Sequence, residues 1–373
     1  MNPRTDAPAG SVRGRGTCGG SSLGRFLPRG FLSPELCILM AILAILVVGV
    51  SLSSQAGSEE ESNRDELGVH ESPVEGVAYA PDGRTVASAS RDGAVMIWDL
   101  ASRRSRRVVT RTVAGFSSVA FSPDGSRLVV GGLADGVKVL DPVTGETLAT
   151  LAKSFGAVRD VTFSPDGASV AVGGDNGLIQ IWNLDSGQLT RTLRGHVGLV
   201  ANLAFAPDGR SLASAGIEDG AILWDLDTGR IRQRLQVDSG ALSSLAFTRD
   251  GRTLAMGGMG CITVYELATG RSRTWTSPQG RVTSVRFLPD GLGLASSGLE
   301  GSIAFWSISP TEILPRFTLR GHKGGVKAMA MSPDGMTLIS GGNDDTVKMW
   351  ALPLAPDRLE ALSSGDPVKI KTG

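Results

Sequence analysis

The chain has 373 residues, of which 41% are apolar and 20% charged, and its formal net charge at pH 7 is zero. This composition is that of a globular protein, and its charge gives no support to a nucleic-acid-binding function. Only Cys261 lies beyond the first apolar segment, so an intrachain disulfide is excluded from the larger part of the chain.

The N-terminal region is basic and then strongly apolar. Its first 57 residues hold five arginines against Asp6 and Glu35, so this part carries +3 and the rest of the chain −3. Residues 1–35 are rich in Gly, Arg and Ser and are expected to be a disordered tail. Residues 36–56 carry no charge and would span about 31 Å as a helix, which matches the hydrocarbon core of a membrane.

Two interpretations of this apolar segment remain open. It predicts either a retained transmembrane signal anchor or a signal peptide cleaved near Ala56, which would release a secreted or periplasmic protein. In both cases the arginines precede the segment and an acidic linker, residues 57–68, follows it. Because basic flanks stay on the cytoplasmic side, we expect the N-terminus in the cytoplasm and the remaining chain on the exported side.

A repeated sequence pattern occupies residues 69–353. The element apolar-x-x-apolar-x-aromatic-x-Pro-Asp-Gly recurs seven times with minor substitutions, and consecutive copies are 42, 42, 42, 42, 40 and 44 residues apart. Such regular spacing is typical of repeat architectures. The aspartates of the seven copies are Asp82, Asp124, Asp166, Asp208, Asp250, Asp290 and Asp334.

Each copy predicts four short strands. Apolar residues alternate before and after the Pro-Asp-Gly turn, and a third strand ends in a large side chain, which is Trp in five copies, Leu140 in the second and Tyr265 in the fifth. A loop such as Asp225 to Gly229 leads to a more polar fourth strand. Four antiparallel strands in about 42 residues form one blade of a propeller, so the sequence predicts an all-β, seven-bladed β-propeller behind one transmembrane helix.

The repeats resemble the WD40 family from about Val69 to Leu352, in a membrane-anchored or exported form of bacterial type. In that family a His, a Ser or Thr, an Asp and a Trp form a hydrogen-bonded structural tetrad inside a blade. The matching positions are His70, Ser88, Asp92 and Trp98 in the first copy, His196, Ser214, Glu218 and Trp224 in the fourth, and His322, Ser340, Asp344 and Trp350 in the seventh. The sixth copy keeps Ser296, Glu300 and Trp306 but has no His, so its tetrad is expected to be broken.

This register argues against catalysis. The three histidines are 126 residues apart and belong to separate blades, so they cannot meet at one metal, and a Ser–His–Asp set within a blade is explained by the tetrad. We therefore predict no catalytic residue, no metal and no cofactor. Propeller dehydrogenases carry turns like Asp141 to Gly145, but the same turn is ordinary between strands of these repeats.

One strand of the ring must come from a chain terminus. The acidic linker 57–68 shows no alternation. The C-terminal segment, residues 354–373, offers two candidates, Arg358 to Leu362 or Val368 to Lys371, and the second alternates cleanly. We therefore expect the C-terminal segment to supply the closing strand.

Propellers generally bind partners through the loops of one face. On the face that carries the His positions, several turns have an apolar side chain where a polar one would be tolerated. These residues are Val113, Leu133, Phe155, Val197, Leu199, Ile217, Met259 and Leu299. They predict either a partner-binding surface centred on the second to fourth blades or a set of side chains that fold inward and cap the ring.

The resulting hypothesis is a membrane-tethered scaffold that binds protein partners and no nucleic acid. A propeller enzyme and a sensor that binds a small ligand in the central channel are the alternatives. A basic cluster between Arg103 and Arg111 is expected to protect an exposed edge strand from pairing, or else to contact an anionic lipid or polymer.

Overall fold

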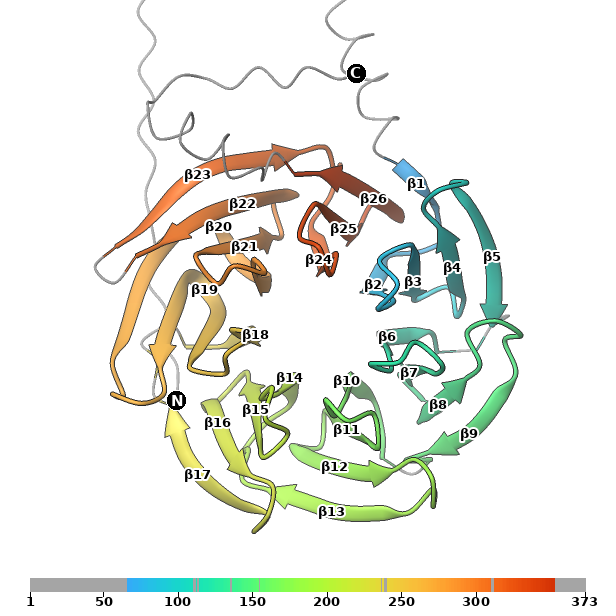
Figure 1. Ribbon diagram of the computed structural model, residues 1–373, viewed down its shortest axis with the longest axis horizontal. Helices are drawn as coiled ribbons and strands as arrows, with labels where there is room; N and C mark the ends of the chain where they lie inside the picture. Colours follow the sequence, from blue (N-terminus) through green and yellow to red (C-terminus); the bar gives the residue numbers. More distant parts are fainter. Residues whose placement is uncertain are drawn as a thin grey trace, which may run out of the picture. The chain divides into compact units, whose positions relative to one another are not determined.

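The computed structural model describes residues 66–352, apart from residues 110, 111, 113, 135, 154, 236, 238, 239, 310 and 311. This part of the chain contains 26 strands, which form antiparallel sheets arranged around a central channel (Figure 1). The predicted transmembrane segment 36–56 and the C-terminal segment 354–373 lie outside it. Among the described residues, no helix has the length and apolar character needed to cross a bilayer.

The first four sheets follow the chain in order, each with its first strand next to the channel. They comprise β2 (Val74–Tyr79), β3 (Thr85–Ser90), β4 (Val95–Asp99) and β5 (Arg104–Val109); β6 (Phe116–Phe121), β7 (Leu128–Gly132), β8 (Val137–Leu140) and β9 (Thr147–Leu151); β10 (Val158–Phe163), β11 (Ser169–Gly174), β12 (Leu178–Asn183) and β13 (Leu189–Arg194); and β14 (Val200–Phe205), β15 (Ser211–Gly216), β16 (Gly220–Asp225) and β17 (Arg230–Leu235).

The remaining strands form two sheets. One has six strands, in the order β18 (Leu242–Phe247), β19 (Thr253–Glu266), β20 (Ser272–Phe287), β21 (Gly293–Gly298), β22 (Ser302–Ile308) and β23 (Ile313–Arg320). The other has four, in the order β1 (Glu66–Val69), β26 (Thr346–Ala351), β25 (Thr337–Gly342) and β24 (Val326–Met331).

The ring therefore has six sheets, and the prediction of a seven-bladed propeller is wrong. The fifth and sixth repeats share the six-stranded sheet, because β19 and β20 run on through segments where the other repeats have separate strands. The first part of β19 pairs with β18 and the second with β20, while the last part of β20 pairs with β21. These two repeats are separated by 40 residues instead of 42, so less chain is left for turns between strands.

The prediction that the C-terminal segment closes the ring is also wrong. The outer neighbour of β26 is β1, which pairs with it antiparallel from Glu66↔Lys348 to Val69↔Thr346. The chain on the N-terminal side of the repeats therefore completes the last sheet. Part of the segment that we interpreted as an acidic linker is this strand.

The recurring Pro-Asp-Gly element forms a tight turn between the first two strands of each repeat. In the first repeat the Asp82 carboxylate accepts hydrogen bonds from the backbone N–H groups of Arg84 and Thr85 at 2.8 and 2.9 Å. Gly83 follows with φ of +65°, a conformation that favours glycine. The motif thus fixes the turn and starts the second strand in register.

The hydrophobic core lies between neighbouring sheets. One cluster, for example, packs Ala89 and Ile97 of the β2–β5 sheet against Phe116 and Leu140 of the β6–β9 sheet. Equivalent clusters join the other sheets around the ring. Each sheet is stable only because its neighbours cover both of its faces, as expected for a repeat architecture.

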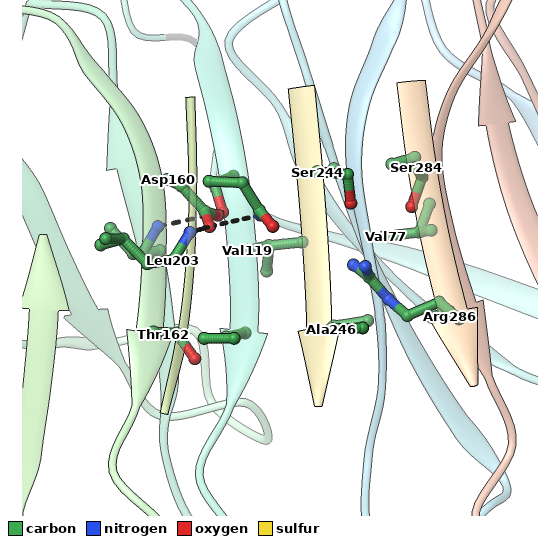
Figure 2. A pocket seen from close by; sticks show the side chains of 18 of the residues that line it. Val77, Val119, Asp160, Thr162, Leu203, Ser244, Ala246, Ser284 and Arg286 are labelled. Carbon is green, nitrogen blue, oxygen red and sulfur yellow. Dashed lines mark hydrogen bonds between the residues drawn. The ribbon is translucent and has the colours of Figure 1, made fainter. Parts of the chain in front are cut away.

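Polar side chains also join successive sheets along the channel wall. Leu203 N donates to Asp160 Oδ2 at 2.7 Å, and Leu245 N donates to Asn202 Oδ1 at 2.8 Å. Asp160 Oδ1 additionally accepts from Ser118 Oγ at 2.7 Å, so this carboxylate joins β6, β10 and β14 (Figure 2). These contacts satisfy backbone donors that would otherwise face the channel unpaired.

Candidate functional site

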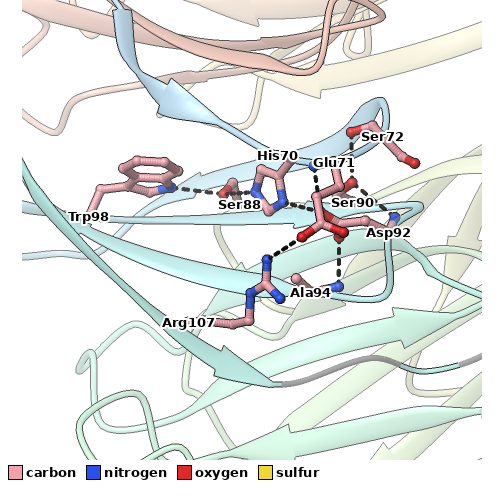
Figure 3. Close-up of polar contacts among 9 residues, drawn as sticks. All are labelled: His70, Glu71, Ser72, Ser88, Ser90, Asp92, Ala94, Trp98 and Arg107. Carbon is pink, nitrogen blue, oxygen red and sulfur yellow. Dashed lines mark hydrogen bonds and ion pairs between the residues drawn. The ribbon is translucent and has the colours of Figure 1, made fainter.

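The first repeat holds a chain of hydrogen bonds that starts at a tryptophan and ends at a carboxylate (Figure 3). Trp98 Nε1 donates to Ser88 Oγ at 2.8 Å, and Ser88 Oγ lies 2.7 Å from His70 Nε2. His70 Nδ1 lies 3.0 Å from Asp92 Oδ2, and the histidine side chain is fully buried. Since an indole only donates and a carboxylate only accepts, Nδ1 carries the proton and Nε2 accepts from the serine.

The seventh repeat has the same arrangement. Trp350 Nε1 donates to Ser340 Oγ at 2.8 Å, which lies 2.7 Å from His322 Nε2. His322 Nδ1 lies 2.8 Å from Asp344 Oδ1, and the carboxylate also accepts from Lys323 N at 2.8 Å. The structure thus brings together the four predicted side chains of this repeat and of the first.

In the fourth repeat the carboxylate that meets the histidine is Asp219, so the prediction of Glu218 is wrong. His196 Nδ1 lies 2.8 Å from Asp219 Oδ1, while Nε2 lies 2.6 Å from Ser214 Oγ, to which Trp224 donates at 2.8 Å. Glu218 is exposed. The turn has the same length as in the first repeat, since the serine and the tryptophan are ten residues apart in both, but its glycine with positive φ comes one residue later. In both repeats the tetrad carboxylate directly precedes this glycine, which is Gly93 in the first repeat and Gly220 in the fourth. The Asp-Gly pair therefore identifies the tetrad carboxylate, whereas a fixed spacing of four residues from the serine does not.

The sixth repeat compensates for its missing histidine with a glutamine that the sequence analysis overlooked. Gln279 is buried, and its Oε1 accepts from Ser296 Oγ at 2.5 Å, while Trp306 Nε1 donates to the same oxygen of Ser296 at 2.8 Å. Gln279 Nε2 donates to the backbone oxygens of Ser296 and Ser302, both at 3.0 Å. Glu300 accepts a hydrogen bond from Ser302 Oγ, and Ser302 is in turn a partner of Gln279. The sixth repeat, whose tetrad we expected to be broken, therefore has a hydrogen-bonded network in which the Gln279 amide takes the place of the histidine.

Two of the tetrad histidines, His70 and His196, should make the propeller less stable in mild acid. Burial lowers the pKa of His70 and His196 below the ordinary value, although their carboxylate partners oppose this. The unfolded chain then takes up protons near pH 6.5 before the folded protein does, so stability present above that pH is lost as pH falls further. We expect the midpoint of urea denaturation to fall between pH 7.5 and 5.5, and less steeply in His70→Gln and His196→Gln. An equal pH slope in the variants would contradict this explanation.

The residues of the predicted partner-binding face differ widely in exposure. Val197, Met259 and Leu299 are 80%, 57% and 43% exposed, whereas Leu133, Leu199 and Ile217 are half-buried. Phe155 is only 5% exposed and belongs to the core between the second and third sheets, so its assignment to the surface is wrong. Val113 lies outside the described residues.

The three exposed side chains share one end of the repeats. Val197 follows the tetrad histidine before β14, Met259 lies at the bend within β19, and Leu299 lies between β21 and β22. They therefore belong to the fourth, fifth and sixth repeats, and the surface is centred further along the chain than predicted. We call Val197, Met259 and Leu299 the apolar face residues.

The described residues contain no group of three or more His, Cys, Asp or Glu side chains arranged to hold a metal ion. Within them each of the three histidines is bonded to a serine and an aspartate of its own repeat. Cys261 is buried in the fifth repeat. The three histidines and their aspartates thus hold together the segments of single repeats.

Comparison with known families agrees with this geometry. The family model described as WD domain, G-beta repeat matches residues 62–99, 145–183, 187–225, 270–307 and 314–351. Each match ends one residue beyond a tryptophan of the third strand, and the two unmatched repeats carry Leu140 and Tyr265 at that position. A search of curated proteins found no match. Because the matched segments cover more than half of the chain, this protein belongs to the WD40 repeat family.

Proposed function

We propose that this protein is a membrane-tethered scaffold whose propeller binds a protein partner through the apolar face residues. WD40 propellers are commonly non-enzymatic and serve as protein-interaction scaffolds. The observation that carries the proposal is the 80% exposure of Val197, directly after the tetrad histidine. At such a loop position a polar residue would not lower the stability of the fold, whereas exposed apolar residues on neighbouring loops are typical of binding surfaces.

The rigid frame beneath these loops supports the same function. Backbone N–H of Val197 donates to Asp219 at 3.2 Å, so the tetrad fixes the loop that presents this side chain. Met259 precedes Gly260, whose φ of +69° turns the chain sharply within β19. Loops held in this way present their side chains without a large loss of conformational entropy on binding.

Substitution of the apolar face should abolish partner binding while the fold is kept. We expect Val197→Asp combined with Met259→Asp to remove a specific partner from cross-linked complexes, because a carboxylate desolvated at an apolar contact costs several kcal/mol. The melting temperature should stay within about 2 °C of the unchanged protein, since both side chains are mostly exposed.

The matched control is Met336→Asp. Met336 is 65% exposed and lies in the Pro-Asp-Gly turn between β24 and β25, at the opposite end of the strands. The partner should be retained by this variant. A partner that is lost equally from Met336→Asp, or retained by the double variant, would refute the proposed face.

The membrane attachment rests on the sequence of residues 36–56 and on the charges around it. Five arginines precede this segment and Glu59, Glu60 and Glu61 follow it, which favours a cytoplasmic N-terminus and an exported propeller. Membrane fractionation with protease protection tests the location, and the N-terminal sequence of the mature protein separates an anchor from cleavage near Ala56. A full-length chain that stays in the cytosolic fraction would refute the tether.

A further inference from the structure

One residue breaks the pattern of small side chains on the channel wall. Four residues before the turn aspartate, six of the seven repeats have alanine or threonine, and the sixth has Arg286 on β20. The small residues are Ala78, Ala120, Thr162, Ala204, Ala246 and Ala330, and all are half-buried. The scaffold therefore needs no cation at this position, and Arg286 calls for another explanation.

Arg286 lines the cavity of about 840 Å³ that the channel forms. A cavity of this size is in the range of small-molecule sites. Its described lining contains four cationic side chains and two carboxylates, namely Arg159, Arg249, Arg286 and Lys327 with Glu75 and Asp160. The channel therefore carries an excess of positive charge.

The other cations of the lining have partners. Arg159 makes two contacts with the Asp175 carboxylate, at 2.5 and 2.9 Å. Lys327 Nζ lies 3.9 Å from Glu75, and Arg249 Nη2 donates to the backbone oxygen of Pro333 at 2.9 Å. Arg159 and Lys327 thus each lie near a carboxylate, and Arg249 uses a donor on a backbone carbonyl.

The Arg286 guanidinium keeps most of its donors available. Within the described residues its one hydrogen bond runs from Nη1 to the backbone oxygen of Val285 at 2.7 Å, and it forms no ion pair. A guanidinium has five N–H donors. The Asp160 carboxylate, the other charge on the inner wall, is occupied by Ser118, Asn202 and Leu203, and the dashed lines in Figure 2 reach it but not Arg286.

We propose that the channel binds a small oxyanion, a phosphate or a carboxylate, on the guanidinium of Arg286. The planar fork of arginine matches two oxygens of such a group and gives a stronger contact than a single charge. The Ser244 and Ser284 hydroxyls lie on the same wall near Arg286 in Figure 2 and offer further donors to the bound anion. This site is separate from the apolar face residues and does not depend on the proposed function.

Calorimetric titration of the folded full-length protein with inorganic phosphate, at constant ionic strength, tests the site. We expect saturable binding in the millimolar range or tighter, weakened at least about tenfold by Arg286→Gln, because a charged bidentate contact is lost. Arg286→Lys should bind with intermediate affinity, since it keeps the charge without the fork. Arg249→Gln is the matched control: it removes the same charge from the same lining and should change the affinity by less than about threefold.

Two results would overturn the proposal. One is the absence of saturable phosphate binding by the unchanged protein. The other is an equal loss of affinity in Arg249→Gln and Arg286→Gln, which would show that the general charge of the channel attracts the anion. Among the described residues Arg286 makes no hydrogen bond between sheets, so we expect its variants to stay folded. Thermal unfolding of each variant without phosphate checks this.

Discussion

A chain that begins at His70 will unfold at a clearly lower temperature than one that begins at Glu66. The four residues between these starts form β1, the outer strand of the last sheet. Their removal deletes the backbone pairing with β26 and exposes the core around Leu67, which is only 9% exposed. We estimate a loss of about 4 kcal/mol from one buried leucine and a strand edge, or roughly 8 °C for a domain of this size.

A single substitution should reproduce much of this effect. A Cβ atom at Gly68 would lie 2.4 Å from the indole ring of Trp98, so Gly68→Val must displace either β1 or a tetrad side chain. Val69→Ala, which alters a 56% exposed side chain in the same strand, is the matched control and should be nearly neutral. Thermal unfolding followed by tryptophan fluorescence gives the comparison.

Closure of the last sheet by the C-terminal segment would predict the opposite effect of truncation. If residues 353–373 supplied the edge of the last sheet, a chain that ends at Leu352 would be the unstable one. We expect that truncation to leave the melting temperature within about 2 °C of the full chain. A large loss from the C-terminal truncation, with none from the N-terminal one, would contradict the pairing of β1 with β26.

Local patterns predicted the strands and turns because they depend on residues close in sequence. The Pro-Asp-Gly turn is one example, since Asp82 binds backbone groups only two and three residues away. The serine and tryptophan of each tetrad lie on paired strands two positions apart in register, as Ser214 and Trp224 do ten residues apart in sequence. Such spacings are fixed by the two-residue period of a strand and can be counted from the sequence.

The features that were missed depend on turn conformation or on pairing through the backbone. Asp219 takes the place predicted for Glu218 because the positive-φ glycine of this turn, Gly220, comes one position later than Gly93 does in the first repeat, which a count from Ser214 cannot detect. β1 has only four residues and pairs through backbone groups, so it carries almost no side-chain pattern. Phe155 looked like a loop residue, yet its backbone N–H bonds to Ala152 in a tight turn and its ring packs into the core.

The merged sheet has a similar origin. The 40-residue spacing between Asp250 and Asp290 was visible in the sequence, but a shortened repeat can lose residues from a strand or from a turn. In the structure the turns are what changed, so β19 and β20 extend through 14 and 16 residues. Repeat number was therefore readable from the sequence, whereas the number of separate sheets was decided by hydrogen bonds between strand ends.

Replacement of Asp160 by alanine should destabilise the propeller by about 3 kcal/mol, because several donors would be left unpaired in the channel wall. These donors are the backbone N–H of Leu203, the side-chain amide of Asn202 and the hydroxyl of Ser118, each 2.7 Å from the carboxylate. They belong to β14 and β6, so the loss would loosen three neighbouring sheets at once.

Asp160→Asn is the matched variant, because an amide can keep the same contacts. Its oxygen accepts from Leu203 and Asn202, and its NH₂ group donates to Ser118 Oγ, whose hydroxyl can rotate. At pH 7 we expect it to lie within about 1 kcal/mol of the unchanged protein. Urea denaturation at equal pH measures both variants, and an asparagine variant as unstable as the alanine one would show that the negative charge itself is required.

The pH dependence separates the charge of Asp160 from its hydrogen bonds. Burial raises the pKa of this carboxyl above its ordinary value, against the hydrogen bonds that Ser118 and Leu203 donate. An acid whose folded pKa is raised contributes stability below its unfolded pKa of 3.8, and that stability is lost as pH rises through the folded value. Asp160→Asn cannot lose a proton, so its stability relative to the unchanged protein should increase between pH 4 and 7. If the difference stays constant over this range, Asp160 does not carry the cost of a buried charge, and its role is confined to the contacts that asparagine also makes.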